Sequence, residues 1–211
     1  MLNKPVLVIG AGGHAAVVVD ILRQLNCNIL ALVATEQPGN HAIFANIPWY
    51  SSDDAVLSFD KDSILLVNGI GSLPGNNVRS KIHQKFKLLG YQFMTVISPN
   101  AIVSEYANLA EGVQIMPGSI VNVNANIGEG TILNSGSIIE HDCLIGQHNH
   151  IAPGAVLSGG VTTADHVHIS TGAKVIQGIT IGEQSVVGAG ATVTKCLESN
   201  KTLYVAKPFL R

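Results

Sequence analysis

The chain has 211 residues, of which 46% are hydrophobic, 12% charged and 5% aromatic, and its formal net charge is −2 at pH 7. Charged residues are about half as common as the roughly 25% of ordinary soluble domains, but no apolar run reaches the ~18 residues of a membrane helix. These values exclude a disordered chain, a membrane-inserted protein and a polybasic nucleic-acid binder. The three cysteines lack metal-ligand or disulfide spacing and the first residues lack the layout of a signal peptide, so we expect a cytoplasmic protein.

The first hundred residues alternate between strand and helix patterns. Residues 5–9 predict a buried strand, and the segment after it carries apolar residues at helical spacing, namely Val17, Val18, Ile21, Leu22 and Leu25. Further strands and one more helix are predicted over residues 28–33, 63–67, 77–89 and 93–97. This order predicts a small, Rossmann-like parallel α/β domain over residues 1–98.

A glycine-rich turn, Gly10-Ala11-Gly12-Gly13-His14, follows the first predicted strand. With Ala15 it matches the G-x-G-x-x-A dinucleotide fingerprint, and Glu36 lies about 20 residues further on. Such glycines let backbone N–H groups approach a phosphate at a helix N-terminus, although the same residues also make a plain tight turn. The domain is short for two mononucleotide halves. We therefore favour one nucleotide, as in a nucleotide-linked sugar, over NAD or FAD.

A six-residue repeat dominates the second half of the chain. Of the 16 positions read every sixth residue from Val103 to Val193, fifteen are Val, Ile or Leu, and Thr163 is the exception. This period fits neither an α-helix nor a flat strand, but it fits a three-sided coil of about 18 residues per turn. The sequence thus predicts a parallel β-helix over residues 99–211 with a short C-terminal cap.

Two further features of the repeat predict details of the coil. A mostly small residue follows each aliphatic position by four and is expected near the bore, which makes Cys143 a packing residue rather than a nucleophile. Glycines are expected to supply corners of positive φ at positions 112, 118, 128, 130, 136, 146 and 154.

Five histidines lie within the repeat: His141, His148, His150, His166 and His168. The spacing of 18 residues predicts that His148 stacks on His166 and His150 on His168, with His150 and His168 facing outward and His141 near a corner. A shared zinc site, as in the γ-class carbonic anhydrases, would need two histidines five residues apart, and none has that spacing. We therefore expect no metal and favour acid–base work by one imidazole.

Three stretches together resemble one family: Gly10 to His14, the run Ile138-Ile139-Glu140-His141-Asp142-Cys143, and the run His150-Ile151-Ala152-Pro153-Gly154. In them the chain resembles the bacterial nucleotide-sugar N-acetyltransferases of the bacillosamine pathway, close to the sialic-acid O-acetyltransferase type, in the hexapeptide-repeat superfamily. The resemblance implies a left-handed parallel β-helix and a homotrimer with active sites between neighbouring subunits. It also implies acetyl-CoA as donor and a UDP-linked 4-amino-4,6-dideoxy sugar as acceptor.

The resemblance also implies roles for single residues. His141 would be the general base that takes a proton from the sugar amine, and Asp142 would raise its basicity, although the relatives carry the longer Glu there. His150 and the backbone of Gly159 would contact acetyl-CoA, with the Gly159 N–H as an oxyanion donor. The uridine nucleotide would be held by Gly12, Gly13, His14 and Gly71. The bacillosamine enzymes carry adjacent acids after the second strand, whereas this chain offers only Glu36.

Two other functions remain open from the residues. One is O-acetylation of a sialic acid or another sugar hydroxyl, and the other is a non-catalytic scaffold that binds a sugar nucleotide. Between residues 100 and 194 one lysine, Lys174, stands against seven acidic residues, a net charge of −6. Coenzyme A is anionic, so basic residues after the repeat (Lys195, Lys207 and Arg211) are candidates to hold its phosphates, with a solvated terminus as the alternative.

Overall fold

The computed structural model describes residues 4–39 and 41–205 and divides the chain into two compact units, Met1–Pro99 and Asn100–Arg211. The first unit holds the α-helices and a parallel sheet, and the second consists of the repeat. In the part of the chain that the structure describes, no helix is long and apolar enough to cross a membrane.

The first unit is built on a four-stranded parallel sheet in the order β3-β2-β1-β4. Its strands are β1 (Val6–Ile9), β2 (Ile29–Val33), β3 (Trp49–Tyr50) and β4 (Leu65–Asn68), and a last short strand of this unit is β5 (Val96–Ile97). Its helices are α1 (Gly13–Gln24), α2 (Val78–Leu88) and the 3₁₀ helices η1 (Ala42–Phe44) and η2 (Asp53–Ser58). The predicted α/β class is confirmed. Strand β3 was not predicted, because two residues with exposed side chains carry no apolar periodicity.

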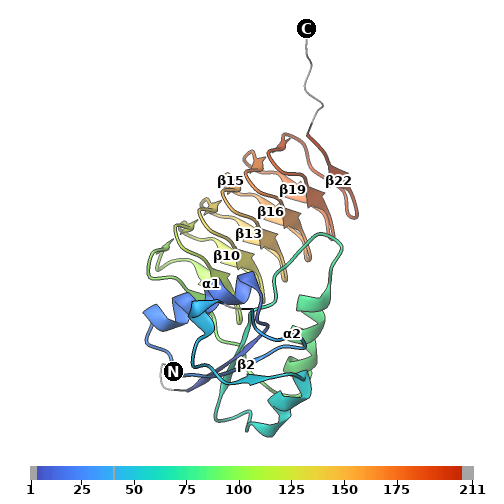
Figure 1. The fold of residues 1–211 in the computed structure, drawn as a ribbon. Coiled ribbons are helices and arrows are strands. Elements are labelled where there is room, and N and C mark those ends of the chain that lie inside the picture. The colour runs from blue at the N-terminus through green and yellow to red at the C-terminus, as the bar shows by residue number, and fades with distance from the viewer. Residues whose placement is uncertain (1–3, 40, 206–211) are drawn as a thin grey trace. The chain divides into compact units, whose positions relative to one another are not determined.

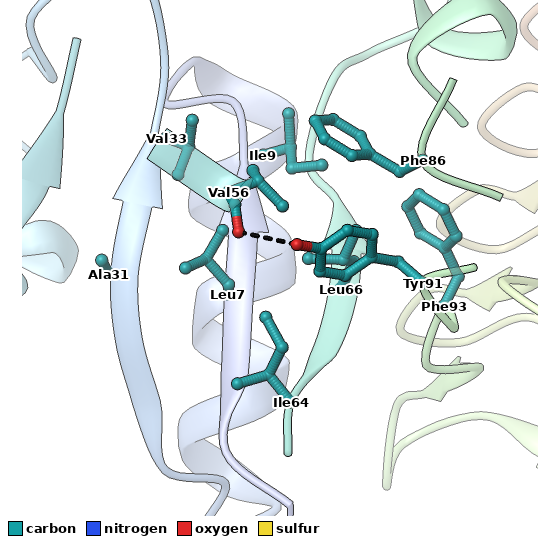
Figure 2. Packing of buried hydrophobic residues seen from close by; sticks show 10 residues of the cluster. All are labelled: Leu7, Ile9, Ala31, Val33, Val56, Ile64, Leu66, Phe86, Tyr91 and Phe93. Carbon is teal, nitrogen blue, oxygen red and sulfur yellow. Dashed lines mark hydrogen bonds between the residues drawn. The ribbon is translucent and has the colours of Figure 1, made fainter. Parts of the chain in front are cut away.

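One hydrophobic core cluster of this unit lies against one face of its sheet. Leu7 and Ile9 alternate on β1 and pack with residues of the neighbouring strands and of η2 and α2, namely Ala31, Val33, Val56, Ile64, Leu66 and Phe86 (Figure 2). The Tyr91 hydroxyl donates to the Val56 carbonyl at 3.0 Å, so this buried ring keeps its polar group satisfied. This packing fixes the carboxyl ends of β1, β2 and β4 relative to one another.

The second unit is a three-sided coil of two-residue strands, drawn in Figure 1 as a stack of short arrows from β10 to β22. Three parallel sheets form its sides. Their members follow in chain order: β6 (Ile102–Val103), β7 (Asn108–Leu109), β8 (Gln114–Ile115), β9 (Ile120–Val121), β10 (Asn126–Ile127), β11 (Ile132–Leu133), β12 (Ile138–Ile139), β13 (Leu144–Ile145), β14 (His150–Ile151), β15 (Val156–Leu157), β16 (Thr162–Thr163), β17 (His168–Ile169), β18 (Lys174–Val175), β19 (Thr180–Ile181), β20 (Val186–Val187), β21 (Thr192–Val193) and β22 (Thr202–Leu203).

Strand pairing follows the predicted coil length. Ile127 pairs with Ile145, Ile145 with Thr163, and Thr163 with Ile181, each 18 residues apart. Thr163 replaces an aliphatic residue because the bore is polar at this level. Its Oγ1 accepts from the buried Asn149 Nδ2 at 2.6 Å, and the Asn149 Oδ1 accepts from the Val167 N–H at 2.6 Å. A buried amide with several partners offsets the cost of removing it from water.

The corners of the coil differ from the prediction in one respect. Positive φ recurs every six residues, but Asn124, Asp142, His148, His166 and Gln184 occupy some of these positions in place of glycine. Short polar and His side chains tolerate this region better than β-branched ones.

Gly128 and Gly146 were predicted at positive φ, and this prediction is wrong. These two glycines are needed for space instead. A Cβ on Gly128 would lie 2.5 Å from the Gly146 carbonyl carbon, and a Cβ on Gly146 would lie 2.5 Å from the Ala164 carbonyl carbon. The backbones of successive coils therefore approach too closely at this corner for any side chain.

After β21 the described chain makes one more, irregular coil over the segment predicted as a short C-terminal cap. Leu197 bridges to Ile181, and β22 pairs with β20 through Leu203 and Val187. The aliphatic positions have shifted out of the six-residue register here, which is why the repeat seemed to end at Val193. Residues 206–211 lie outside the described part of the chain.

Candidate active site

A pocket of about 720 Å³ lies at the carboxyl ends of β1, β2 and β4 in the first unit. β2 and β4 pair with opposite edges of β1. The order in which the chain adds strands to the parallel sheet therefore reverses at β1. Ligands of open α/β sheets bind at such a switch point. The lining includes all four residues expected to hold the nucleotide, Gly12, Gly13, His14 and Gly71, together with Glu36.

The glycines of this pocket serve two different purposes. Gly10 has φ +107°, and a Cβ on it would lie 2.9 Å from the Gly69 carbonyl carbon, so it permits close contact between the two turns. A Cβ on Gly12 or Gly13 would meet nothing within 4 Å. These two positions therefore border open space at the N-terminus of α1, where N–H groups without helical partners favour an anion.

In the second unit His141 and Asp142 form the turn between β12 and β13. The His141 Nδ1 lies 2.7 Å from the Asp142 Oδ2, so the shorter acid does reach the ring. Hydrogen bonds from His141 and then from Asn124 (Nδ2 to Oδ1, 3.1 Å) hold the pKa of Asp142 below its usual value. An ionised carboxylate only accepts, so Nδ1 carries a proton and Nε2 of the neutral ring carries a lone pair. The two side chains are 60% and 58% exposed, which leaves the pair accessible.

Gly159 lies directly beside the His141 ring, one coil further on. The two residues are 18 apart, and the Gly160 N–H donates to the His141 carbonyl at 2.9 Å. A Cβ on Gly159 would lie 2.6 Å from both Nε2 and Cε1 of His141. The imidazole thus occupies space that any other residue would fill. The structure brings together His141, Asp142 and Gly159.

His150 lies on β14 rather than at the His141 turn. It is only 9% exposed, its ring packs edge-on against His168 at 4.8 Å, and its Nε2 lies 3.0 Å from the Asn134 Nδ2. Burial lowers the pKa of His168. The predicted stacking of His148 on His166 is confirmed, with ring centroids 5.4 Å apart. A contact from His150 to acetyl-CoA stays a prediction.

Cys143 follows the His141–Asp142 pair in sequence but, unlike these two exposed residues, it is buried. It is fully buried, its Sγ donates to the Ser158 carbonyl at 3.3 Å, and burial raises the pKa of its thiol. A protonated thiol is a poor nucleophile. We expect Cys143→Ala to keep the kcat of the wild type in a thiol-release assay. A loss of turnover in a folded variant, or an acetylated Cys143 in the intact-protein mass spectrum, would contradict this.

Sequence reasoning missed two asparagines that support the turn carrying His141 and Asp142. Asn124 holds Asp142, and the Asn122 Nδ2 donates to the Glu140 Oε2 at 2.8 Å. Both pairs are 18 residues apart, so the register alone could have found them. Among residues 4–39 and 41–205, no group of three or more His, Cys, Asp or Glu could hold a metal ion. Lys195 is exposed, while Lys207 and Arg211 lie outside the described residues.

A glycine-lined pocket on an α/β sheet and an exposed His–Asp pair on a β-helix of six-residue repeats define a hexapeptide-repeat transferase. Comparison with known proteins agrees with this class. The model described as the PglD N-terminal domain matches residues 5–86, and the bacterial transferase hexapeptide model matches residues 124–159. The chain is 33% identical over 113 residues to UDP-N-acetylbacillosamine N-acetyltransferase of Bacillus subtilis (strain 168). The matched segment is 54% of this chain and 51% of the relative, so the match spans about half the length of that relative.

Two solved structures cover nearly the whole chain. PerB from Caulobacter crescentus, solved with CoA and GDP-perosamine, is 32% identical with a TM-score of 0.84 and covers 95% of this chain and 93% of its own. The acetyltransferase domain of PglB from Neisseria gonorrhoeae, solved with acetyl coenzyme A, is 27% identical with a TM-score of 0.86 and covers 95% of each chain. These matches confirm the predicted fold class. The chain belongs to the acetyl-CoA-dependent nucleotide-sugar N-acetyltransferases of the hexapeptide-repeat superfamily.

Proposed function

We propose that this chain transfers the acetyl group of acetyl-CoA to the amino group of a UDP-linked 4-amino-4,6-dideoxy sugar, with His141 as general base. The observation that carries the proposal is the His141–Asp142 pair, 2.7 Å apart and seated on Gly159. The relatives support the substrate class, because their names and complexes include CoA, acetyl coenzyme A and sugar nucleotides. Two further structures of the Caulobacter enzyme carry a histidine replaced by asparagine or alanine.

The reaction is a direct transfer. The sugar amine attacks the thioester carbonyl carbon, a C–N bond forms, and the amine loses one proton to the His141 Nε2. The resulting tetrahedral oxyanion collapses as the C–S bond breaks, and the thiolate of coenzyme A takes up the proton that His141 received, which regenerates the neutral imidazole. The Gly159 N–H is the proposed donor to the oxyanion, since a fixed backbone N–H stabilises charge that develops in the transition state. His150 contacts acetyl-CoA, the acetyl donor, and completes its binding site.

Asp142 fixes the tautomer that this step needs. Its carboxylate binds Nδ1–H and so leaves the lone pair on Nε2, and it stabilises the imidazolium that forms. Since hydrogen bonds hold the pKa of Asp142 low, it stays anionic throughout the range in which a histidine titrates. A carboxylate that became protonated in the same pH range as the histidine could not hold the tautomer in this way.

The nucleotide binds in the pocket of the first unit. Gly12 and Gly13 border the space at the N-terminus of α1, and His14 and Gly71 line the same pocket. The name of the Bacillus relative supports uridine as the nucleoside. The proposal also includes a homotrimer, since the β-helix exposes apolar side chains that a second copy would cover, namely Ile102 (67%), Tyr106 (66%) and Leu144 (50%).

The experiment is a thiol-release assay with acetyl-CoA and a matched panel of acceptors. The panel contains UDP- and GDP-linked 4-amino sugars, the same sugars with a hydroxyl in place of the amine, and a sialic acid. Release with the UDP-linked 4-amino sugar, and an amide in the product by mass spectrometry, is the expected result. Release with the GDP-linked sugar alone would contradict UDP as the nucleotide of the substrate. Release only with hydroxyl acceptors would favour O-acetylation, and no release would favour a binding scaffold.

A further inference from the structure

Arg79 is a buried cation behind one wall of the nucleotide pocket. It is the second residue of α2 and only 5% exposed. Its Nη1 donates to the Asn68 carbonyl at 2.7 Å and to the Ile70 carbonyl at 2.6 Å. The guanidinium thus binds the backbone on both sides of Gly69, at the turn where β4 ends.

Asn68 holds the same turn from the opposite direction. Its Nδ2 donates to the Arg79 carbonyl at 3.0 Å, and its Oδ1 accepts from the Ile70 N–H at 3.1 Å. The two side chains form a reciprocal arrangement that we name the Arg79–Asn68 clamp. The segment it holds, Gly69 to Gly71, is part of the pocket lining.

The clamp sets a close approach between the two turns of the pocket. The Gly69 N–H donates to the Ile9 carbonyl at 2.7 Å, and a Cβ on Gly69 would lie 2.9 Å from the Ala15 Cβ. There is therefore little free space between this segment and the Gly10 turn. A small rotation of the 68–70 backbone would move both Gly71 and the turn that is expected to hold the phosphates.

The charge of Arg79 has a second consequence. Among the described residues that line the pocket none is Lys or Arg, whereas Glu36 and Asp53 are acidic. The pyrophosphate of a sugar nucleotide is anionic, so these carboxylates oppose its binding. Burial lowers the pKa of Arg79 to about 9, and the group therefore remains charged at neutral pH. In a buried position this charge is weakly screened.

We propose that Arg79 is a positioning residue for the nucleotide pocket, which fixes the Gly69–Gly71 wall through two backbone carbonyls and offsets the negative charge of Glu36 and Asp53 from behind that wall. This inference rests on the proposed function only in that the ligand is a nucleoside diphosphate derivative. Arg79 does not touch the reacting atoms, so it acts on nucleotide affinity and not on the chemical step.

The test compares Arg79→Gln and Arg79→Lys with Lys81→Gln as the matched control, since Lys81 is an exposed cation on the same helix. Binding of UDP and of GDP is measured by calorimetry, with thermal unfolding of each variant. We expect Arg79→Gln to weaken nucleotide binding about 10- to 100-fold, Arg79→Lys to recover part of it, and Lys81→Gln to bind as the wild type. In turnover assays the KM for the sugar nucleotide should rise while kcat and the KM for acetyl-CoA stay unchanged.

A second variant guards against a folding defect. Asn68→Asp keeps an acceptor for the Ile70 N–H and the two Arg79 bonds to backbone carbonyls, but it loses the Nδ2 donor to the Arg79 carbonyl. It also places an anion beside Arg79, which offsets the charge of the guanidinium. We expect a folded protein with weaker UDP or GDP binding. Wild-type affinity in folded Arg79→Gln and Asn68→Asp, or equal losses in kcat and in affinity for both substrates, would overturn the inference. If the wild type itself binds neither UDP nor GDP, the proposed function is contradicted, and so is this inference, which depends on it.

Discussion

Replacing His141 by alanine is expected to lower kcat by about 10²–10⁴-fold, which is the usual contribution of a positioned general base. The ring is held from two sides, by Asp142 at Nδ1 and by Gly159 beneath Nε2, so its lone pair has a defined direction. Because the side chain is 60% exposed and lies on a turn, its removal creates no cavity in the core. We therefore expect the folded state and the affinity for coenzyme A and UDP to persist, and the loss to lie in kcat.

The matched control for this variant is His166→Asn. His166 occupies a corner of the same β-helix at positive φ, a conformation that asparagine also tolerates. It is expected to keep the kcat of the wild type in the same thiol-release assay. If His141→Ala turned over at the rate of the wild type, or if both variants lost activity equally, the assignment of His141 as the base would be wrong.

Gly159→Ala is expected to reduce kcat on the order of 10²-fold without unfolding the protein. Its φ is not in the left-handed region, so the backbone accepts alanine, but the new Cβ would lie 2.6 Å from the His141 Nε2 and must displace the ring. Misplacement of a catalytic group by about 1 Å costs a factor of this size. Steady-state kinetics with both substrates saturating measure the effect.

A double-mutant cycle separates displacement of His141 from other effects. In the His141→Ala background there is no ring to displace, so Gly159→Ala should cost little further activity. The control is Gly160→Ala, since Gly160 has φ +69° and open space around its Cα. That variant is expected to lose stability, by about 1 kcal/mol, and to keep its kcat. A full, additive loss from Gly159→Ala in the double variant would show that Gly159 acts independently of His141.

The register of the β-helix could be predicted from the sequence because one side chain in six must fill the bore. Once the coil length is 18 residues, the stacking of His148 on His166 follows, and so does the placement of Gly159 beside His141. The same arithmetic predicts that Asn124 reaches Asp142. The backbone register aligns these residues on successive coils, and the side-chain rotamers then complete the contacts.

Other parts of the site could not be predicted in this way. The polar bore around Asn149 and Thr163 breaks the aliphatic rule, and only the hydrogen bonds show why it is tolerated. Arg79 lies in the first turn of α2, and its sequence context predicts a solvated residue, because charged side chains seldom lie in a core. Its burial depends on how α2 rotates about its axis and on two carbonyls from a distant turn, which no local pattern encodes.

The most direct test of the account is a crystal structure of the chain with coenzyme A and the UDP-linked amino sugar. The measured quantity is the distance from the His141 Nε2 to the nitrogen of the sugar amine. We predict about 2.6–3.2 Å, or one bridging water, with the coenzyme A sulfur beside the same amine and a neighbouring subunit next to His141. An amine beyond the reach of His141, with another side chain in contact with it, would contradict the account.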